Sequence, residues 1–289
     1  MKKRGQITYF LILGLMLVIV AGFIIYVRNI NVKKPNIEKP SESADTDIVK
    51  SYAETCIKII AEEALFSKIG PQGGYINPKS QPNIDSGKSR YNSDPIQFEG
   101  KSVPYFLEEL TINGDTRYYT FIPTLDSIEK KLENQIKSEF DNCFDSSIFK
   151  DKGIVITEPI DKNKVKVSVN ANREDVSINF QYPLIVKKGT VQSNLDEFSL
   201  TLPIRLRSLH EWASKLVEDI KNKQPQEYYI SANCNFDKKG LTNIYLDDIP
   251  EKGQIIRIVD FSTYFQKYLK SFDFQFAVKD VHINGKCSK

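Results

Sequence analysis

The sequence has few of the residues that metal-dependent and nucleophilic catalysis use most often. It contains only two histidines, and none of its four cysteines forms a Cys-x-x-Cys pair. It also lacks the His-Glu-x-x-His motif of metallopeptidases and the Gly-x-Ser-x-Gly motif of serine hydrolases. A catalytic site made of two paired carboxylates is not excluded, since a single sequence cannot show which acidic residues lie close together in space. We therefore expect a non-catalytic protein with no cofactor and no metal site.

The chain also has no large excess of either charge. It has 40 Lys and Arg residues against 37 Asp and Glu residues, a net charge of +3, and the basic residues do not gather into a stripe. Nucleic-acid-binding surfaces show such a stripe, so we expect no nucleic acid among the partners. No Asn-x-Ser/Thr sequence occurs either, so N-glycosylation at that acceptor is not expected.

One long stretch has no charge at all. Residues 7–27 are uncharged and mostly apolar. As a helix they would span about 31 Å, and the core of a bilayer is about 30 Å thick. Residues 1–30 are therefore predicted to be a cytoplasmic tip and a single transmembrane helix. The alternatives are a buried helix of a soluble protein and a cleaved signal peptide, for which the run is too long.

The flanking charges predict the orientation of this helix. A compact basic cluster, Lys2-Lys3-Arg4, precedes it, whereas the basic residues after it are spread out. The positive-inside rule then places the N-terminus inside the cell and the long C-terminal part outside. Residues 31–46 contain Pro35 and Pro40 and are predicted to be a linker.

The part after the linker has the composition of a folded domain, with 40% hydrophobic and 27% charged residues. Apolar residues at helical spacing predict amphipathic helices over 46–69 and from Pro123 to Cys143. Between them, Asn113-Gly114 predicts a β-hairpin. Residues 47–150 are thus predicted to form a helix-hairpin-helix subdomain. Four charged residues of the second helix are expected to form a solvated face: Glu129, Lys130, Lys131 and Glu133.

Alternating apolar residues predict strands in the rest of the chain. Four such runs between Ile154 and Leu206 indicate an antiparallel meander. A capping box, Ser208-Leu209-His210-Glu211, predicts the start of a helix that covers the meander, and together they fill residues 151–225. Residues 226–289 are predicted to be a C-terminal β-rich segment. The fold class is α+β, an N-terminal transmembrane helix followed by an ectodomain of antiparallel β-meander packed with amphipathic helices.

The even number of cysteines predicts two disulfides in a chain exposed outside the cell. Cys56 and Cys143 both lie on the apolar stripes of their helices, so we expect them to pair. Cys234 and Cys287 both lie in the C-terminal segment and are the expected second pair. The alternative, four buried free thiols, requires a cytosolic domain.

A glycine pair follows the first expected helix of the ectodomain. Gln72-Gly73-Gly74-Tyr75 opens a long polar stretch, and long loops inside domains are often functional. Because glycine allows a backbone to approach a ligand closely, this is the candidate binding loop. The alternative is a helix stop with a tight turn. The loop lacks the Lys and Ser/Thr of a phosphate-binding loop.

The N-terminus carries a resemblance to a known class of export signal. Lys-Arg-Gly-Gln followed by an apolar run resembles the prepilin-type (class III) signal of archaeal pilins and related surface proteins. The resemblance implies that a membrane peptidase cuts after Gly5 and leaves Gln6 as the first residue. Many pilins carry an acidic residue where this chain has Phe10, which argues against filament assembly more than against processing. A plain uncleaved anchor is the alternative.

The chain as a whole is similar to a group of single-pass archaeal surface proteins that offers no established activity. The similarity covers most of the chain, and it implies the topology and the compartment only. The motifs that carry it are the Lys-Arg-Gly-Gln anchor, the cysteine-bearing helix before Gln72-Gly73-Gly74-Tyr75-Ile76, the Pro123-Thr124 helix, Tyr182-Pro183-Leu184 and Phe274-Gln275-Phe276-Ala277-Val278.

Two functions are compatible with these observations. The first is a membrane-anchored, non-catalytic extracytoplasmic surface protein with a pilin-like or envelope-structural role, which meets protein partners through its ectodomain. The second is an extracytoplasmic ligand- or peptide-binding module. An exposed apolar patch would favour the first function, and a closed pocket with convergent polar groups near Gln72 would favour the second.

Overall fold

The computed structural model describes residues 43–78, 93–112, 114–157, 165–222, 227–229, 242–265, 267–268, 270–279 and 282–284. The expected transmembrane run, the processing site at Gly5 and Gln6, and the expected Cys234–Cys287 pair all lie outside these residues. The chain falls into two compact units, Met1–Asp45 and Thr46–Lys289, and the second is the subject below. Among the described residues, no helix is long and apolar enough to cross a membrane.

Two helices of this unit follow the expected pattern. Helix α2 (Ser43–Ala64) continues into a π-helix, η1 (Leu65–Ile69), and begins before the expected start at Thr46. Helix α3 (Leu125–Cys143) ends as expected and begins two residues after the expected Pro123, because the Thr124 hydroxyl caps it by accepting a hydrogen bond from the backbone N–H of Ser127 at 3.2 Å. The apolar stripe of α3 is buried as the spacing predicts: Ile128, Leu132, Ile136 and Phe140.

The expected meander is a sheet with a long central strand. Its strands are β5 (Ile154–Thr157), β6 (Lys166–Ala171), β7 (Val176–Lys188) and β8 (Val191–Leu202), all antiparallel. The prediction of a simple meander is wrong for β5, which pairs with β7 rather than with β6. Strand length explains this, since β6 covers only residues 176–181 of β7 and leaves the remaining edge to β5.

Helix α3 protects the outer edge of β6. The Glu129 carboxylate accepts a hydrogen bond from the backbone N–H of Ala171 at 2.7 Å, and Glu133 accepts one from Val169 at 3.2 Å. These two carboxylates occupy donors that would otherwise be open to another strand. The expected solvated face of α3 is therefore wrong for Glu129 and Glu133, which are structural.

A second, five-stranded sheet has the order β10-β11-β12-β3-β4. It combines β10 (Thr242–Ile249), β11 (Gly253–Phe265) and β12 (Lys270–Val278) with the expected hairpin, β3 (Tyr105–Ile112) and β4 (Asp115–Thr120). The β12–β3 pair is parallel and the other pairs are antiparallel. The expected segments 47–150 and 226–289 thus share one sheet within one compact unit.

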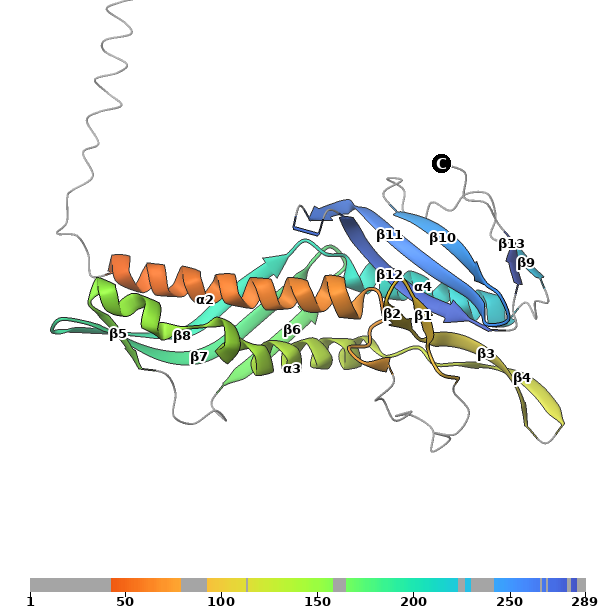
Figure 1. The fold of residues 1–289 in the computed structure, drawn as a ribbon, viewed down its shortest axis with the longest axis horizontal. Helices are drawn as coiled ribbons and strands as arrows, with labels where there is room; N and C mark the ends of the chain where they lie inside the picture. Colours follow the sequence, from red (N-terminus) through yellow and green to blue (C-terminus); the bar gives the residue numbers. More distant parts are fainter. Residues whose placement is uncertain are drawn as a thin grey trace, which may run out of the picture. The chain divides into compact units, whose positions relative to one another are not determined.

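Helix α4 (Leu206–Asn222) packs on this second sheet, against β11 and β3, and not on the meander (Figure 1). Its predicted start at a capping box is also wrong. Ser208 lies inside the helix and donates its hydroxyl to the carbonyl of Arg173 at 2.8 Å, in the turn between β6 and β7. The first turn of the helix reaches the meander through this bond and through a bond from Arg207 to the Ala171 carbonyl at 2.7 Å.

A buried ion pair joins the start of α4 to the second sheet. The Arg205 guanidinium donates to both carboxylate oxygens of Asp260, at 3.0 and 2.6 Å, and to the Thr242 hydroxyl at 2.9 Å. Asp260 also accepts from the backbone N–H and the hydroxyl of Ser262. The two charged side chains are 8% and 0% exposed, and the donors around Asp260 compensate for the lost hydration.

The remaining short elements complete an α+β fold, which confirms the expected class of the ectodomain. They are the 3-10 helix η3 (Ser146–Lys152), the hairpin β1 (Ile96–Phe98) with β2 (Lys101–Val103), and the parallel pair β9 (Glu227–Tyr229) with β13 (His282–Asn284). One continuous apolar core runs under both sheets, with stacked or tilted rings such as Phe106 on Phe276 and Phe140 on Phe180.

Candidate functional site

The predicted disulfide between Cys56 and Cys143 is confirmed. It joins the middle of α2 to the last residue of α3, with the two Cα atoms 5.7 Å apart. Cys56 is buried, and Tyr52, one turn earlier on α2, donates its hydroxyl to the Cys143 carbonyl at 3.0 Å. A covalent bond and a hydrogen bond thus hold α2 and α3 side by side, as Figure 1 shows.

The candidate binding loop is packed into the core. Gln72, Gly73 and Gly74 are buried, and Tyr75 is half-buried. Both glycines have positive φ angles, 56° and 84°. A Cβ atom on Gly73 would lie 2.8 Å from the Gln275 carbonyl oxygen, and one on Gly74 would lie 2.5 Å from the Ile128 side chain. The glycines therefore allow this turn to sit against β12 and α3, whereas a role in binding stays a prediction.

Alanine substitution separates this packing role from the backbone requirement. Gly189 has nearly the same φ as Gly73, 59° against 56°, but no atom lies within 4 Å of its would-be Cβ. We expect Gly189→Ala to cost about 1–2 kcal/mol for the left-handed conformation alone. Gly73→Ala should cost about 1–3 kcal/mol more because of overpacking. Urea denaturation of both variants measures the difference, and equal costs would contradict a packing role.

Two basic side chains bind backbone oxygens at this turn or next to it. The Lys131 ammonium lies 4.1 Å from the centre of the Tyr75 ring and 3.4 Å from the Gly74 carbonyl oxygen. Burial lowers the pKa of Lys131 to about 8. His210 donates through Nε2 to the Pro123 carbonyl at 2.7 Å. Burial also lowers the pKa of His210, against the opposing effects of the Pro123 bond and the Glu211 charge. Both groups are directed at backbone oxygens, which gives them a structural role.

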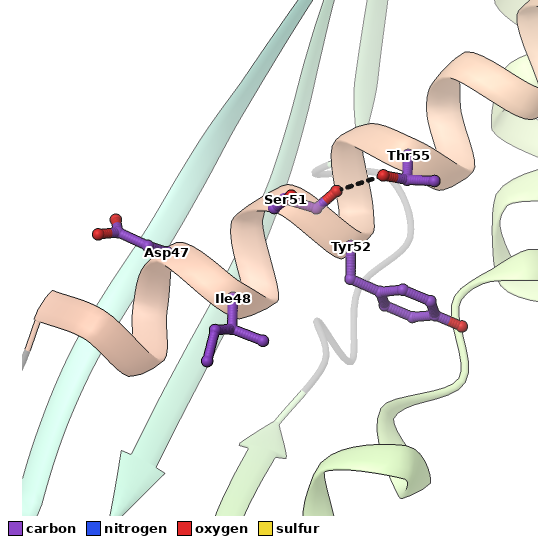
Figure 2. Close-up of a pocket in the computed structure, with 5 residues that line it drawn as sticks. All are labelled: Asp47, Ile48, Ser51, Tyr52 and Thr55. Carbon is purple, nitrogen blue, oxygen red and sulfur yellow. Dashed lines mark hydrogen bonds between the residues drawn. The ribbon is translucent and has the colours of Figure 1, made fainter.

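An open hollow of about 410 Å³ lies at the start of α2, far along the helix from this turn. Its lining comes entirely from the first turns of the helix: Asp47, Ile48, Ser51, Tyr52 and Thr55. Figure 2 shows the Thr55 hydroxyl donating to the Ser51 carbonyl, at 2.7 Å, and Asp47 pointing away from the Tyr52 ring. The polar groups therefore do not converge on one point, and the hollow is a surface feature rather than a closed pocket.

Exposed apolar side chains surround this end of the unit. Ile48 on α2, Ile148 on η3 and Val155 on β5 are 43%, 47% and 58% exposed, and we call these three residues the end patch. Their elements are in contact. The Tyr52 ring lies 5.5 Å from the ring of Phe149, next to Ile148, and η3 packs against β5. The three residues are thus exposed apolar positions on elements that meet at this end of the unit, with Val155 on the outer face of its sheet.

Sequence reasoning missed the end patch, although one signal was present. Ile154 is buried and Ile156 half-buried on the inner face of β5, so the alternation places the apolar Val155 on the outer face. An apolar residue at the solvent position of a strand can indicate an interaction surface. Ile148 gave no comparable signal, because η3 is too short for a helical period to be recognised.

Neither a metal site nor a known relative identifies the chemistry of this protein. In the ranges that the structure describes, no three His, Cys, Asp or Glu side chains gather closely enough to hold a metal ion. Burial lowers the pKa values of Lys131 and His210, and both side chains bind backbone carbonyls. Comparisons with protein families, with curated proteins and with solved structures find no match to this chain.

Proposed function

We propose that this protein is a membrane-anchored, non-catalytic extracytoplasmic surface protein that meets protein partners through its ectodomain, in a pilin-like or envelope-structural role. The observation that carries the proposal is the Cys56–Cys143 disulfide. Disulfides form and persist in oxidising compartments and are rare in the cytosol. The disulfide therefore favours a place outside the cytoplasm for the unit that holds it.

The charge-free run of residues 7–27 supplies the anchor in this proposal. A linker of ordinary length separates this run from the ectodomain, and the run is long enough to span a bilayer once. The end patch supports an interaction role, because exposed apolar residues gathered at one end of a unit can mark a contact surface.

The second candidate function is a ligand- or peptide-binding module. The hollow at the start of α2 favours it, since its lining combines the Asp47 carboxylate with Ser51, Thr55 and Tyr52. The openness of the hollow and the divergence of its polar groups place this candidate below the first.

Protease treatment of intact cells tests the leading proposal. We expect added trypsin to remove the ectodomain while the expected transmembrane run stays in the membrane fraction, because trypsin can cut the Lys33–Lys34 bond of the linker. Full protection in intact cells would contradict the proposal.

A further inference from the structure

A stripe of exposed residues runs along α2. Ile48 and Ile59 are each 43% exposed and lie eleven residues apart on this helix, which is close to three full turns. The exposed Thr55 lies seven residues after Ile48 and four before Ile59, so the three side chains share one face of the helix. We call Ile48, Thr55 and Ile59 the α2 stripe.

The hollow beside this stripe has the form that receives a side chain of a second helix. Four of its lining residues occupy positions i, i+3, i+4 and i+7 of α2: Ile48, Ser51, Tyr52 and Thr55. In packed helix pairs, four residues at this spacing form the hole that takes one apolar knob of the facing helix. Ile59 is the apolar member of the stripe outside the hole, so a second copy of α2 can supply the knob.

The charges along the stripe fit an antiparallel pair of helices. With Ile59 of a second copy in the hole, Lys58 of that copy comes within about 3 Å of Glu54, measured along the helix axis. Glu54 and Lys58 lie one turn apart on one flank of the stripe, and like flanks face each other in an antiparallel pair. Their side chains are 32% and 54% exposed, and their ion pairs within the helix are long, at 4.0 and 3.8 Å. A parallel pair in register would instead bring Lys58 against Lys58.

The far end of the stripe can also accept the partner. The first turn of the second α2 comes level with Glu62 and Glu63, where its Asp47 adds a third carboxylate. Lys267 is close enough to both glutamates to interact with their charges. This ammonium group therefore offsets the added negative charge.

We propose that a second copy of this chain docks on the α2 stripe, with the two α2 helices antiparallel about a two-fold axis near Thr55. This inference rests on the proposed function, a surface protein that meets protein partners, and it names the partner. An axis normal to the bilayer places both copies equally above one membrane. Residues 28–42 can span at most about 50 Å, and tethering in one membrane gives a small interface a high effective concentration.

Photo-cross-linking of the full chain in the membranes of expressing cells tests this pairing. A benzoylphenylalanine side chain replaces Ile59, and the band at twice the mass of the chain is cut from a reducing gel and digested with trypsin. We expect the adduct on residues 51–58 of the second copy, which contribute to the hole. The same probe at Lys50 should give no such band, because that position is two residues from Ile48 and faces away from the stripe.

Variants of matched exposure test the individual contacts. Ile48→Asp should lower the cross-linked band about fivefold or more, whereas Phe261→Asp, at a residue that is 45% exposed on β11, should leave it unchanged. Lys58→Glu should also lower the band. Adding Glu54→Lys to that variant should restore most of it, because opposite charges then face each other again.

Four results would overturn the pairing. They are the absence of the band, an adduct on residues 59–68 as parallel helices would give, a double charge reversal that restores nothing, and a cross-linked band that contains a different protein. Trypsin release from the same cells is read separately. An ectodomain that is released but not cross-linked rejects the pairing alone, whereas an ectodomain that is fully protected rejects the proposed function, and the pairing at a cell surface with it.

Discussion

Replacing Cys56 and Cys143 with alanine should lower the free energy of unfolding by about 4–5 kcal/mol, the chain-entropy value for so long a loop. The two cysteines are 87 residues apart in sequence, so the bond restricts the unfolded chain strongly. It also joins α2 to α3, and α3 in turn protects the edge of β6. Urea denaturation without reductant measures the change.

The single variants make this test sharper. If the covalent link is the main contribution, Cys56→Ala and Cys143→Ala should each cost nearly as much as the double variant, because either one removes the same bond. If the losses of the two single variants add up to the loss of the double variant, the effect comes instead from packing around the buried Cys56 side chain. A double variant that loses less than about 1 kcal/mol would contradict a stabilising disulfide.

Replacing Asp260 with alanine should lower the free energy of unfolding by about 3–5 kcal/mol, because it leaves the Arg205 charge buried without its partner. The pair is almost fully shielded from water and connects the start of α4 to β10 and β11 through Thr242 and Ser262. Thermal or urea denaturation, followed by circular dichroism, measures the loss.

A half-buried ion pair in the same sheet provides the control. The Arg257 Nε atom lies 2.8 Å from Oδ2 of Asp247, but the two side chains are 25% and 31% exposed. Asp247→Ala should therefore cost only about 0–1 kcal/mol. Replacing the whole buried pair, with Arg205→Met and Asp260→Leu, should recover part of the loss because no lone charge remains. If Asp260→Ala and Asp247→Ala lowered the free energy of unfolding equally, burial of the Arg205–Asp260 pair would not be the reason for the expected loss.

The features that could be predicted from the sequence are those that local periodicity encodes. The stripe of α3 depends on residues within one helix and is found as expected, with the helix starting within two residues of the predicted Pro123. Cys56 and Cys143 could be paired because each lay on such a stripe. The β3–β4 hairpin followed from a turn signal between two short apolar runs.

The features that could not be predicted depend on contacts between distant segments. Nothing near Ile154 indicates that β5 pairs with the far end of β7 instead of with β6. Glu129 and Glu133 looked like solvated charges because their partners are distant in sequence. Each accepts a hydrogen bond from a backbone N–H group on the edge of β6, 42 residues away for Glu129 and 36 for Glu133. Ser208 formed a plausible capping box until Arg173 proved to be its partner.

The most direct test of the account is the accessibility of the linker in intact cells. In residues 31–46 trypsin can cut only the Lys33–Lys34 bond, because Lys34 and Lys39 both precede proline. Trypsin added outside should therefore release a fragment that begins at Lys34 and carries the Cys56–Cys143 disulfide. A variant with glutamine at Arg28 and Lys33 should resist this release, because no bond between the apolar run and residue 46 is then open to trypsin. A cytosolic protein of the same cells should stay intact. The account predicts release from intact cells of the parent chain only. Cleavage that occurs only after the cells are disrupted would contradict it and place the ectodomain inside.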